Sequence, residues 1–301
     1  MIETPTTNPM RGPNTFKLGV FSANCDGGLT MSLAPERWPA NWDDIAAMCQ
    51  IADRAGMEFI LPVAKWRGYQ GKANIYGKSF ETMTHSAAIG ALTKQICVFS
   101  TIHVPLVTPA FAAKAISTID HITHGRAGLN IVCGWNQEEF DLHGVTIEQD
   151  TRYDHGLEWY QIWSRMLEGG PEFDWDGRFF KLRRLETNPV SVQRPHPLVM
   201  SAGFSPKGRD FAAQAADALF TTMTELDQAH LRILDHPRAA GDAGVRSQGD
   251  CDHRSHHPWT SRAQHRLRLE PGGIRPARRR DRSRRPIRPR IGMVPGVVAD
   301  A

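Results

Sequence analysis

The sequence predicts an α/β fold with a parallel sheet, and three observations lead to this prediction. Short apolar segments of strand length alternate with amphipathic segments of helix length between residues 17 and 222, which is typical of parallel strands joined by right-handed helical crossovers. Polar residues gather after the predicted strands, at the end where such barrels bind ligands. The alternation stops near residue 230, where the composition changes. We therefore expect a (β/α)8 barrel of the TIM-barrel type that is incomplete, with about six strands.

The first part of the chain contains three pairs of a strand and a helix. The helix predicted over residues 41–56 has apolar side chains at Ile45, Met48, Ile51 and Ala52, a spacing that favours one buried face. Gly56 follows as a residue suited to end a helix. The predicted strands of this part are residues 17–22, 57–63 and 95–101, and its predicted helices are residues 41–56, 80–93 and 109–124.

The second part continues the pattern and adds a hairpin. Asp176-Gly177 stands between aromatic and apolar residues, which predicts a β-hairpin over residues 172–182, inserted before the next barrel strand. A closed barrel of eight strands needs two more than this pattern supplies, and a sixth helix is predicted over residues 225–234. The other predicted elements are the strands 127–133, 197–201 and 218–222 and the helices 152–167 and 206–215.

Residues 230–301 differ in composition from the rest of the chain. Residues 1–229 contain 12 Arg and 8 Lys against 25 acidic residues, whereas residues 230–301 contain 16 Arg, no Lys and 7 acidic residues. The net charges are −5 and +9, so the basic balance of the whole chain comes from its C-terminal part. Trp259 is the single aromatic residue there. Such a segment is too poor in apolar side chains to build a core.

Two explanations account for this tail. A basic arm that binds nucleic acid or anionic lipid would fit the charge, but such arms usually mix Lys with Arg. A shift of reading frame in a GC-rich gene also fits, because out-of-frame GC-rich codons favour Arg, Pro, Ala and Gly, and we prefer this explanation. We divide the chain into a disordered N-terminus (1–16), a truncated barrel (17–229) and an irregular Arg-rich tail (230–301), and we expect no nucleic-acid partner.

Other features exclude several classes of protein. Residues 1–15 are polar and Pro-rich, and no apolar run approaches about 18 residues, so we expect no signal peptide and no membrane span and predict a cytoplasmic protein. The five cysteines are widely spaced without a CxxC pair. They predict buried reduced thiols rather than a disulfide framework or a metal site. No Walker loop, GxGxxG turn or Ser-His-Asp arrangement supports a different enzyme class.

One segment carries a specific resemblance to a known family. Residues 121–140 read His-Ile-Thr-His-Gly-Arg-Ala-Gly-Leu-Asn-Ile-Val-Cys-Gly-Trp-Asn-Gln-Glu-Glu-Phe, after Ile119-Asp120. This pattern resembles the central motif of the bacterial luciferase-like flavin monooxygenases, and the resemblance extends over about residues 17–223. Residues 65–72, Lys-Trp-Arg-Gly-Tyr-Gln-Gly-Lys, are most similar to the pyrimidine monooxygenase branch. The dimethyl sulfone and alkanesulfonate monooxygenases come next.

The resemblance implies which residues hold a flavin. The positions that match the FMN contacts of the family are Ala64, Lys65, Asn130, Glu139, Arg152, Tyr153 and Ser205. Independently of the family, Ser205 before Pro206 is typical of a helix N-terminus, whose free amides suit a phosphate, although a plain cap is the alternative. Arg152 can donate two parallel hydrogen bonds to phosphate. Asn130 on an apolar strand needs a polar partner, which either a flavin ring or the protein can supply.

Thr101 and His103, near the end of a predicted strand, are the candidate catalytic residues. His103 can assist proton transfer during flavin oxygen chemistry. A lone histidine in such a position is more often structural, and we keep that alternative.

The resemblance implies a two-component FMN-dependent monooxygenase. A separate NAD(P)H-dependent flavin reductase would supply reduced FMN, which with O2 would oxygenate a small pyrimidine-like or organosulfur substrate. The resemblance also implies a homo-oligomer. Two alternatives stay open: an inactive, truncated flavin-binding product of a frame-shifted gene, and a deazaflavin-dependent oxidoreductase, which the monooxygenase motifs favour less.

Overall fold

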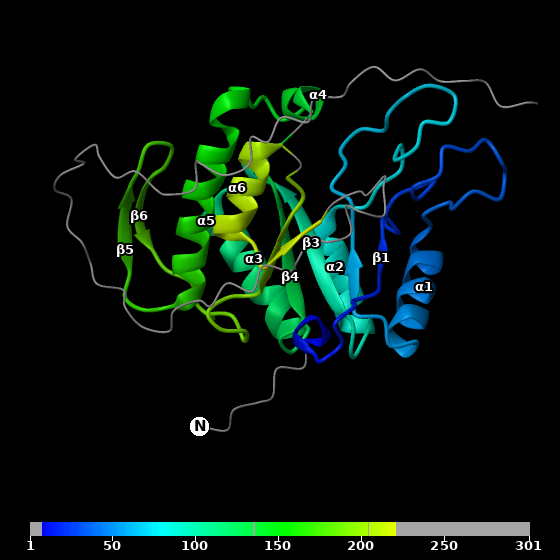
Figure 1. The fold of residues 1–301 in the computed structure, drawn as a ribbon, viewed down its shortest axis with the longest axis horizontal. Coiled ribbons are helices and arrows are strands. Elements are labelled where there is room, and N and C mark those ends of the chain that lie inside the picture. Colours follow the sequence, from blue (N-terminus) through cyan, green and yellow to red (C-terminus); the bar gives the residue numbers. More distant parts are fainter. Residues whose placement is uncertain (1–7, 135, 204, 221–301) are drawn as a thin grey trace, which may run out of the picture. The chain divides into compact units, whose positions relative to one another are not determined.

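The computed structural model describes residues 8–134, 136–203 and 205–220. Six parallel strands form one sheet in the order β1-β2-β3-β4-β7-β8, and β5 and β6 form a separate antiparallel pair (Figure 1). This confirms the predicted α/β fold with six parallel strands. The strands are β1 (Gly19–Phe21), β2 (Phe59–Leu61), β3 (Cys97–His103), β4 (Ala127–Val132), β5 (Phe173–Asp176), β6 (Lys181–Leu185), β7 (Leu198–Ser201) and β8 (Ala218–Leu219).

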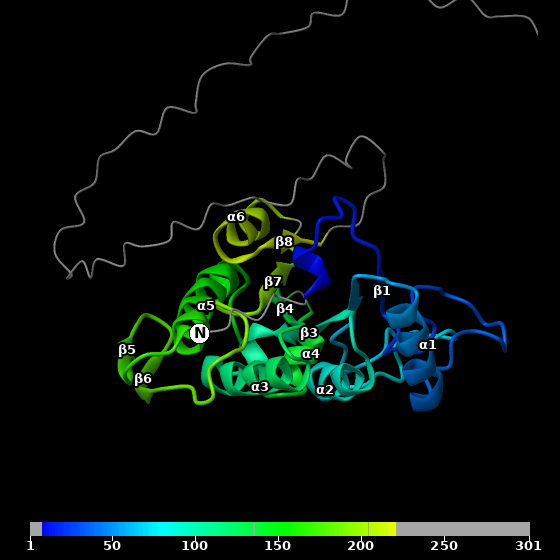
Figure 2. The ribbon, with the colours of Figure 1, turned by 90° about the horizontal axis from the view of Figure 1, so that it is seen from below.

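The helices cover the outer side of this sheet. The sheet curls into about half of a barrel, and α1, α2, α3, α5 and α6 follow one another around it (Figure 2). The α helices are α1 (Trp42–Arg54), α2 (Thr82–Leu92), α3 (Pro109–Ile122), α4 (Gln137–Asp141), α5 (Arg152–Glu168) and α6 (Pro206–Ala215). Three short 3₁₀ helices accompany them: η1 (Pro9–Arg11), η2 (Val104–Leu106) and η3 (Gln149–Thr151).

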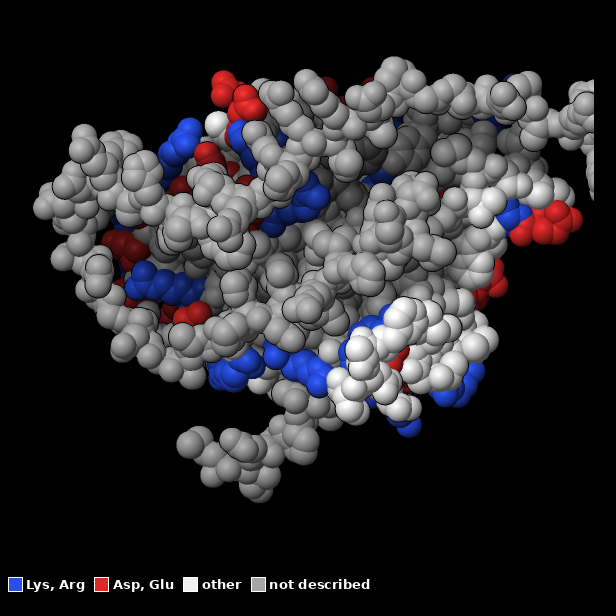
Figure 3. All heavy atoms as spheres, in the orientation of Figure 1, with Lys and Arg blue, Asp and Glu red and all other residues white. Residues whose placement is uncertain are grey.

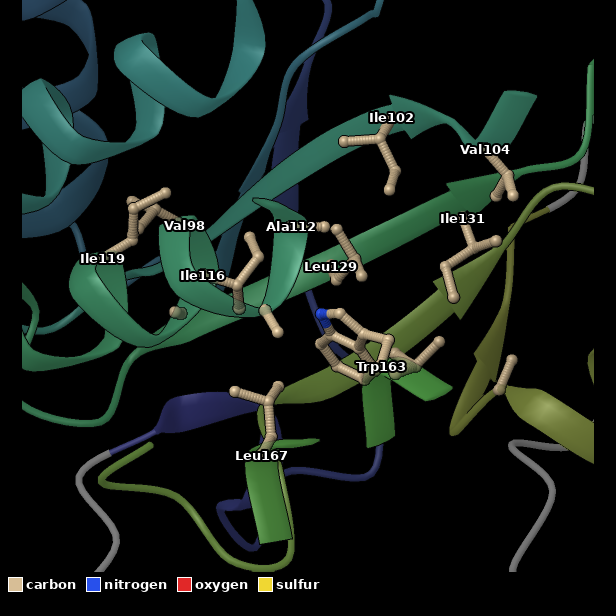
Figure 4. Packing of buried hydrophobic residues seen from close by; sticks show 14 of the residues in the cluster. Val98, Ile102, Val104, Ala112, Ile116, Ile119, Leu129, Ile131, Trp163 and Leu167 are labelled. Atoms are coloured by element: carbon tan, nitrogen blue, oxygen red, sulfur yellow. The ribbon is translucent and has the colours of Figure 1, made fainter. Parts of the chain in front are cut away.

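Alternate strand residues face opposite sides of the sheet, as the two-residue period of a strand requires. On the outer side, β3 and β4 direct Val98, Ile102, Leu129 and Ile131 toward the helices, where they pack with α3 and with Trp163 of α5 (Figure 4). These strand residues are at most 3% exposed. The main apolar core therefore lies between the sheet and its helices.

A second cluster fills the inner, concave side of the sheet. Phe99 of β3 packs edge-on against Phe59 of β2, with ring centroids 6.2 Å apart. Gly128 of β4 leaves room for this ring, because a Cβ atom there would lie 2.5 Å from Phe99. Phe21 of β1 meets Phe220, the residue after β8, at 4.8 Å. A side chain of one edge strand and the residue that follows the other edge strand of the described sheet thus touch across the inside of the half-barrel.

The structure refines several expectations about individual elements. The short helix α4 was not predicted, and β3 continues through His103 instead of ending at residue 101. Ile51, predicted to face the core, is 58% exposed, whereas Cys49 of the same helix is fully buried. The face of α1 is therefore rotated toward Cys49 and Ala52. The predicted helix over residues 225–234 lies outside the described residues.

The described part of the N-terminal segment and the cysteines are held in place. Asn8 is buried and donates a hydrogen bond to the Gln193 side chain at 3.1 Å, and η1 follows it, within the segment that was expected to be disordered. Four cysteines are buried free thiols, and burial raises the pKa of each to about 12: Cys25, Cys49, Cys97 and Cys133. Cys251 lies outside the described residues. None of the helices described here is long and apolar enough to cross a membrane.

The predicted hairpin forms and packs beside α5. Glu158 of α5 accepts hydrogen bonds from the indole of Trp175 at 3.1 Å and from the backbone amides of Phe179 and Phe180 at 3.0 Å each. The outer surface of the hairpin carries exposed ion pairs such as Lys181 with Asp176. Figure 3 shows basic and acidic side chains gathered together over this hairpin. One half-buried carboxylate therefore anchors an otherwise solvated element.

Candidate active site

The carboxyl ends of the parallel strands surround a cavity of about 540 Å³. Parallel α/β barrels bind their ligands at this end of the strands. Seven of the predicted site residues line the cavity, and they come from the ends of β2, β3, β4 and β7 and from the first turn of α5: Ala64, Thr101, His103, Asn130, Arg152, Tyr153 and Ser205. Lys65 and Glu139 lie beside it as a pair. The fold therefore brings together side chains that are far apart in the sequence.

Thr101 and Asn130 form the floor of the cavity. They stand opposite each other in the register of β3 and β4, and they are 5% and 4% exposed. The Thr101 hydroxyl donates to the carbonyl of Pro62 at 2.6 Å and accepts from the Asn130 amide nitrogen at 3.1 Å. The amide oxygen of Asn130 is buried without a hydrogen-bond partner among the described residues. A buried polar atom of this kind points to a ligand or water.

Lys65 and Glu139 form a buried ion pair that joins the loop after β2 to α4. The ammonium nitrogen lies 2.9 Å from Oε1 of Glu139, and the two side chains are 3% and 1% exposed. The same Oε1 accepts a hydrogen bond from the backbone amide of Trp66 at 3.0 Å. Oε2 has no hydrogen-bond partner within the described residues. Glu139 thus fixes the loop and still has one acceptor available.

His103 ends β3 between the cavity and this ion pair. Its Nδ1 lies 3.9 Å from Oε2 of Glu139, too far for a hydrogen bond. Burial lowers the pKa of His103 to about 4, and the negative charge of Glu139 only partly opposes that effect. The imidazole is therefore neutral near pH 7, so it can accept or donate one hydrogen bond but carries no charge toward a ligand.

The N-terminus of α6 forms a further wall of this cavity. Ser205 caps this helix by accepting a hydrogen bond from the amide of Gly208 at 3.1 Å, with Pro206 in the first turn. The Tyr153 hydroxyl lies 3.4 Å from the Ser205 hydroxyl. Gly203 allows this arrangement, because a Cβ atom at that position would lie 2.5 Å from the carbonyl oxygen of Gly208. A helix N-terminus with two hydroxyls suits an anion.

Arg152 adds a positive charge to this wall. The side chain is buried, and it donates to the Gln137 amide oxygen at 2.9 Å and to the carbonyl of Ile147 at 3.4 Å. Its guanidinium lies over the ring of Phe140, with the central carbon 5.1 Å from the ring centroid. Its Nε has no hydrogen-bond partner in the described part of the chain. The guanidinium is therefore held in place through one of its nitrogens, and its Nε is not used by a described group.

Sequence reasoning missed some residues of the site. Gln137, which holds Arg152, belongs to the unpredicted helix α4. Phe21 and Phe220 also line the cavity, and nothing in their neighbouring sequence marks them. The sequence could have predicted the role of Gly203. Residues 203–208 read Gly-Phe-Ser-Pro-Lys-Gly, so a glycine stands on each side of the start of a helix. Trp135, the tryptophan of the central motif, lies outside the described residues.

A second cavity of about 650 Å³ adjoins the first. The two cavities share Ala64, Thr101 and His103, and the second continues between apolar side chains of α2 and α3 such as Met83 and Phe111. Within the described ranges, no three His, Cys, Asp or Glu side chains gather in a way that could hold a metal ion.

Comparison of the sequence with known proteins identifies its relatives. The model of the luciferase-like monooxygenase family matches residues 16–265. The chain is 30% identical over 221 residues to pyrimidine monooxygenase RutA of Bradyrhizobium sp., which covers 72% of this chain and 61% of that protein. It is also 30% identical over 225 residues to an FMNH2-dependent dimethylsulfone monooxygenase of Pseudomonas putida, which covers 73% of this chain and 60% of that protein. The chain thus spans about 60% of the length of these curated relatives.

The solved structures agree on the fold. A riboflavin lyase, RcaE, crystallised with modified FMN and riboflavin, superposes with a TM-score of 0.65 at 20% sequence identity. The match covers 71% of this chain and 56% of the lyase. At this identity the likeness supports the barrel architecture and not a particular reaction.

Proposed function

The chain belongs to the luciferase-like monooxygenase family, and from this premise we propose that it binds reduced FMN and oxygenates a small organic substrate with O2. The observation that carries the proposal is the cavity at the carboxyl ends of the strands. Its floor presents a buried amide oxygen without a partner, and its wall presents a helix N-terminus beside a buried arginine. The helix N-terminus and the arginine suit the phosphate of FMN, and the amide suits the polar edge of its ring.

The wall formed by α6 fits the phosphate end of FMN. Backbone amides at a helix N-terminus and a guanidinium both favour a doubly charged phosphate over a neutral ligand. Ser205, Tyr153 and Arg152 would hold this group, since all three line the same cavity. The free Nε of Arg152 adds a donor that no described protein group uses.

The floor fits the ring end of FMN. An isoalloxazine has a polar edge of carbonyl and N–H groups, and the buried amide of Asn130 offers a partner to it. His103 and Ala64 would close the same end, His103 as a neutral group. Bound flavin supplies the oxygen chemistry, while the protein orients it and keeps water from the ring.

The charge balance of the site favours an uncharged substrate. Lys65 is a buried cation on the loop after β2, and its charge is matched by Glu139 at 2.9 Å. The pair adds no net charge to the cavity wall, so an anionic substrate would gain little there. The relatives named above act on a pyrimidine and on dimethylsulfone, and a small neutral heterocycle or sulfone is the substrate class that we propose.

The test separates flavin binding from turnover. Purified chain is titrated anaerobically with reduced FMN, and product is then measured with a separate NADH-dependent flavin reductase, O2, and either uracil or dimethyl sulfone. We expect binding and a product that depends on both O2 and the chain. Absence of reduced-FMN binding at 100 µM would remove the basis of the proposal.

A second candidate follows from the composition of residues 230–301. A frame-shifted product would retain the predicted flavin-contact residues, the last of which is Ser205, and would bind flavin without turnover. A version of the chain in which residues 230–301 are replaced by the alternative-frame translation provides the comparison. Product formation by the replaced version alone would favour this candidate, whereas equal turnover by both would exclude it.

A further inference from the structure

An apolar arm, residues 28–35, lies between β1 and α1 at the carboxyl end of the parallel strands (Figure 1). It contains no charged residue. Leu29, Met31 and Leu33 are 67%, 82% and 67% exposed. Single exposed apolar side chains are common on protein surfaces, whereas several that gather on one segment mark an interaction site. The three exposed side chains on one uncharged segment therefore indicate that a partner covers the arm.

The base of the arm is fixed on the body of the molecule. Asp26 and Arg37, one on each side of the arm, form an ion pair at 3.0 Å. The backbone amide of Gly27 donates to the carbonyl of Trp38 at 2.8 Å. Arg37 also donates to the carbonyl of Ala73 in the loop after β2. A loop whose ends are already positioned loses little conformational entropy on binding, which favours association.

The second cavity, between α2 and α3, is complementary to the arm in size and charge. Its volume of about 650 Å³ lies in the range of pockets that enclose a drug-sized ligand, which is larger than the three side chains of the arm. Among the described residues that line it, Lys65 and Glu81 are the ones with a formal charge. Both charges are bonded within the protein, Lys65 to Glu139 and Glu81 to backbone amides in the first turn of α2. Most of the wall is apolar, with Met83, Ala87, Leu106, Phe111 and Ala115 among its residues. An apolar segment could therefore fill this cavity without leaving a charge unpaired.

Helix α2, which forms one side of this cavity, has no charged side chain from Thr82 to Leu92. A helix on the surface of a protein normally carries charged residues on its outer side, and a helix that is apolar all round is normally buried. On α2, however, Thr84, Ala91 and Leu92 are exposed. The absence of charge on this helix therefore indicates that its outer side is covered in the assembled protein.

We propose that two copies of this chain form a symmetric dimer in which the arm of each copy inserts into the second cavity of the other. The arm does not fill the cavity of its own chain, because Leu29, Met31 and Leu33 stay exposed while the base of the arm is fixed. A second copy covers both surfaces at once, since a two-fold axis brings the arm of one copy to the cavity of the other and repeats the contact. The repetition doubles the area that one insertion buries, toward the total of about 1,200 to 2,000 Å² of a stable interface.

Arm and cavity belong to one continuous part of the surface. Ala73, which bonds the base of the arm, lies in the loop that also places Lys65 and Trp66 at the cavity. The second cavity shares Ala64 and His103 with the first. Each inserted arm would therefore keep water away from that side of its partner's first cavity. The dimer itself does not depend on flavin.

Sedimentation velocity over about a hundredfold range of concentration tests the dimer in the wild-type chain, Met31→Asp, Ala115→Phe and Ile51→Asp. Met31→Asp places a charge on the arm, and Ala115→Phe fills part of the cavity. Ile51→Asp is the matched control, since Ile51 is a 58% exposed apolar residue of α1 that belongs to neither surface.

We expect the wild-type chain and Ile51→Asp to dimerise alike. The dissociation constants of Met31→Asp and Ala115→Phe should rise by about 30-fold or more, which is the effect of changing a residue at the centre of an interface. Met31 is 82% exposed, so Met31→Asp should fold as the wild-type chain does. It decides the test by itself if Ala115→Phe does not fold.

Cross-linking tests which copy supplies the arm. Every variant carries Cys251→Ser, and the other four cysteines are buried. Met31→Cys and Ala115→Cys are prepared as separate chains, mixed, and treated with a short bismaleimide. We expect a covalent dimer in the mixture and in neither chain alone, because one thiol comes from the arm and the other from the cavity.

A wild-type chain that stays monomeric at every concentration would overturn the proposal, and so would a dimer that Met31→Asp does not weaken. A mixture without a covalent dimer would overturn it as well. A cross-link within one chain of the double variant Met31→Cys with Ala115→Cys would show that the arm covers its own cavity instead. None of these outcomes bears on FMN binding, which the titration described above decides separately.

Discussion

Buried charged groups are hydrogen-bonded more completely at the amino end of the parallel strands than at the carboxyl end. At the amino end, the carboxylate of Asp53 accepts hydrogen bonds from the three successive backbone amides of residues 94–96, at 2.8 to 3.0 Å. Arg126 donates from all three of its nitrogens to one hydroxyl and four backbone carbonyls. At the carboxyl end, Glu139 and Arg152 each retain a buried atom without a partner in the described chain.

This difference separates two roles: the buried charged groups at the amino end stabilise the framework, and those at the carboxyl end leave polar atoms that a ligand could bond. Fully bonded groups at the amino end tie the ends of α2 and α3 to the beginnings of β3 and β4, so they stabilise the framework. Polar atoms left unpaired at the carboxyl end cost stability, and a ligand that bonded them, as proposed above for FMN, would return it. Functional sites in barrels of this class follow the same division.

Removal of Arg126 should have the largest effect on stability. Arg126→Ala leaves four buried carbonyls without their donor, and we expect it to lower the free energy of unfolding by about 3 to 5 kcal/mol. Urea unfolding monitored by tryptophan fluorescence measures the loss. Flavin affinity of the molecules that remain folded should stay within about twofold of wild type, and a large selective loss of affinity would contradict the division between the two ends.

The Lys65–Glu139 pair tests whether the carboxyl end also carries stability. Glu139→Gln removes the counter-charge of a buried ammonium, and we expect a loss of about 3 kcal/mol in the free energy of unfolding. The double variant Lys65→Met with Glu139→Gln removes both charges and should recover most of this loss. Equal unfolding midpoints for the single variant and the wild-type chain would show that the pair contributes nothing.

Arg152 should matter for binding more than for stability. Arg152→Ala removes a charge-assisted donor for the phosphate, and we expect reduced-FMN affinity to fall by about 10- to 100-fold, or roughly 1.5 to 3 kcal/mol. Riboflavin, which lacks the phosphate, provides the control ligand, and its affinity should change little. A similar loss for both ligands would place Arg152 away from the phosphate.

The pH dependence of stability should reveal the buried neutral histidines. Burial lowers the pKa of His103 from 6.5 to about 4, with Glu139 opposing this effect, and burial lowers that of His85 on α2 to about 4, with Glu81 opposing. Folding therefore favours the neutral imidazole, and its contribution is complete above pH 6.5 and is lost as the pH falls toward 4.

Between pH 7 and pH 5, His103 should account for a loss of about 1 to 2 kcal/mol in the free energy of unfolding. His103→Gln should reduce the slope of stability against pH in this range, and His85→Gln should do so by a similar amount through a site remote from the cavity. Urea unfolding at half-unit pH steps gives both slopes. An unchanged slope in His103→Gln would indicate that its folded-state pKa is close to 6.5.

Much of the fold could be predicted because its signals are local. Helix α6 has the bounds that the sequence predicts, since Ser205 and Pro206 mark its first turn within two neighbouring residues. The Asp176-Gly177 turn likewise predicted the hairpin that β5 and β6 form. Helix α4 was missed because five residues give too short a period to detect. The face of α1 was misjudged at Ile51, because periodicity alone does not say which side of a helix meets the sheet.

The sequence by itself determined the alternation of strands and helices, the change of composition near residue 230, and which polar residues follow the strands. Only the tertiary structure decided how those residues pair. Trp66 and Glu139 are 73 residues apart, and Thr101 and Pro62 are 39 apart. Capping and hydrophobic periodicity act over a few residues, whereas a buried donor or acceptor bonds whichever group the packed strands bring beside it. The orientation of the Asn130 amide therefore depends on the fold rather than on any motif.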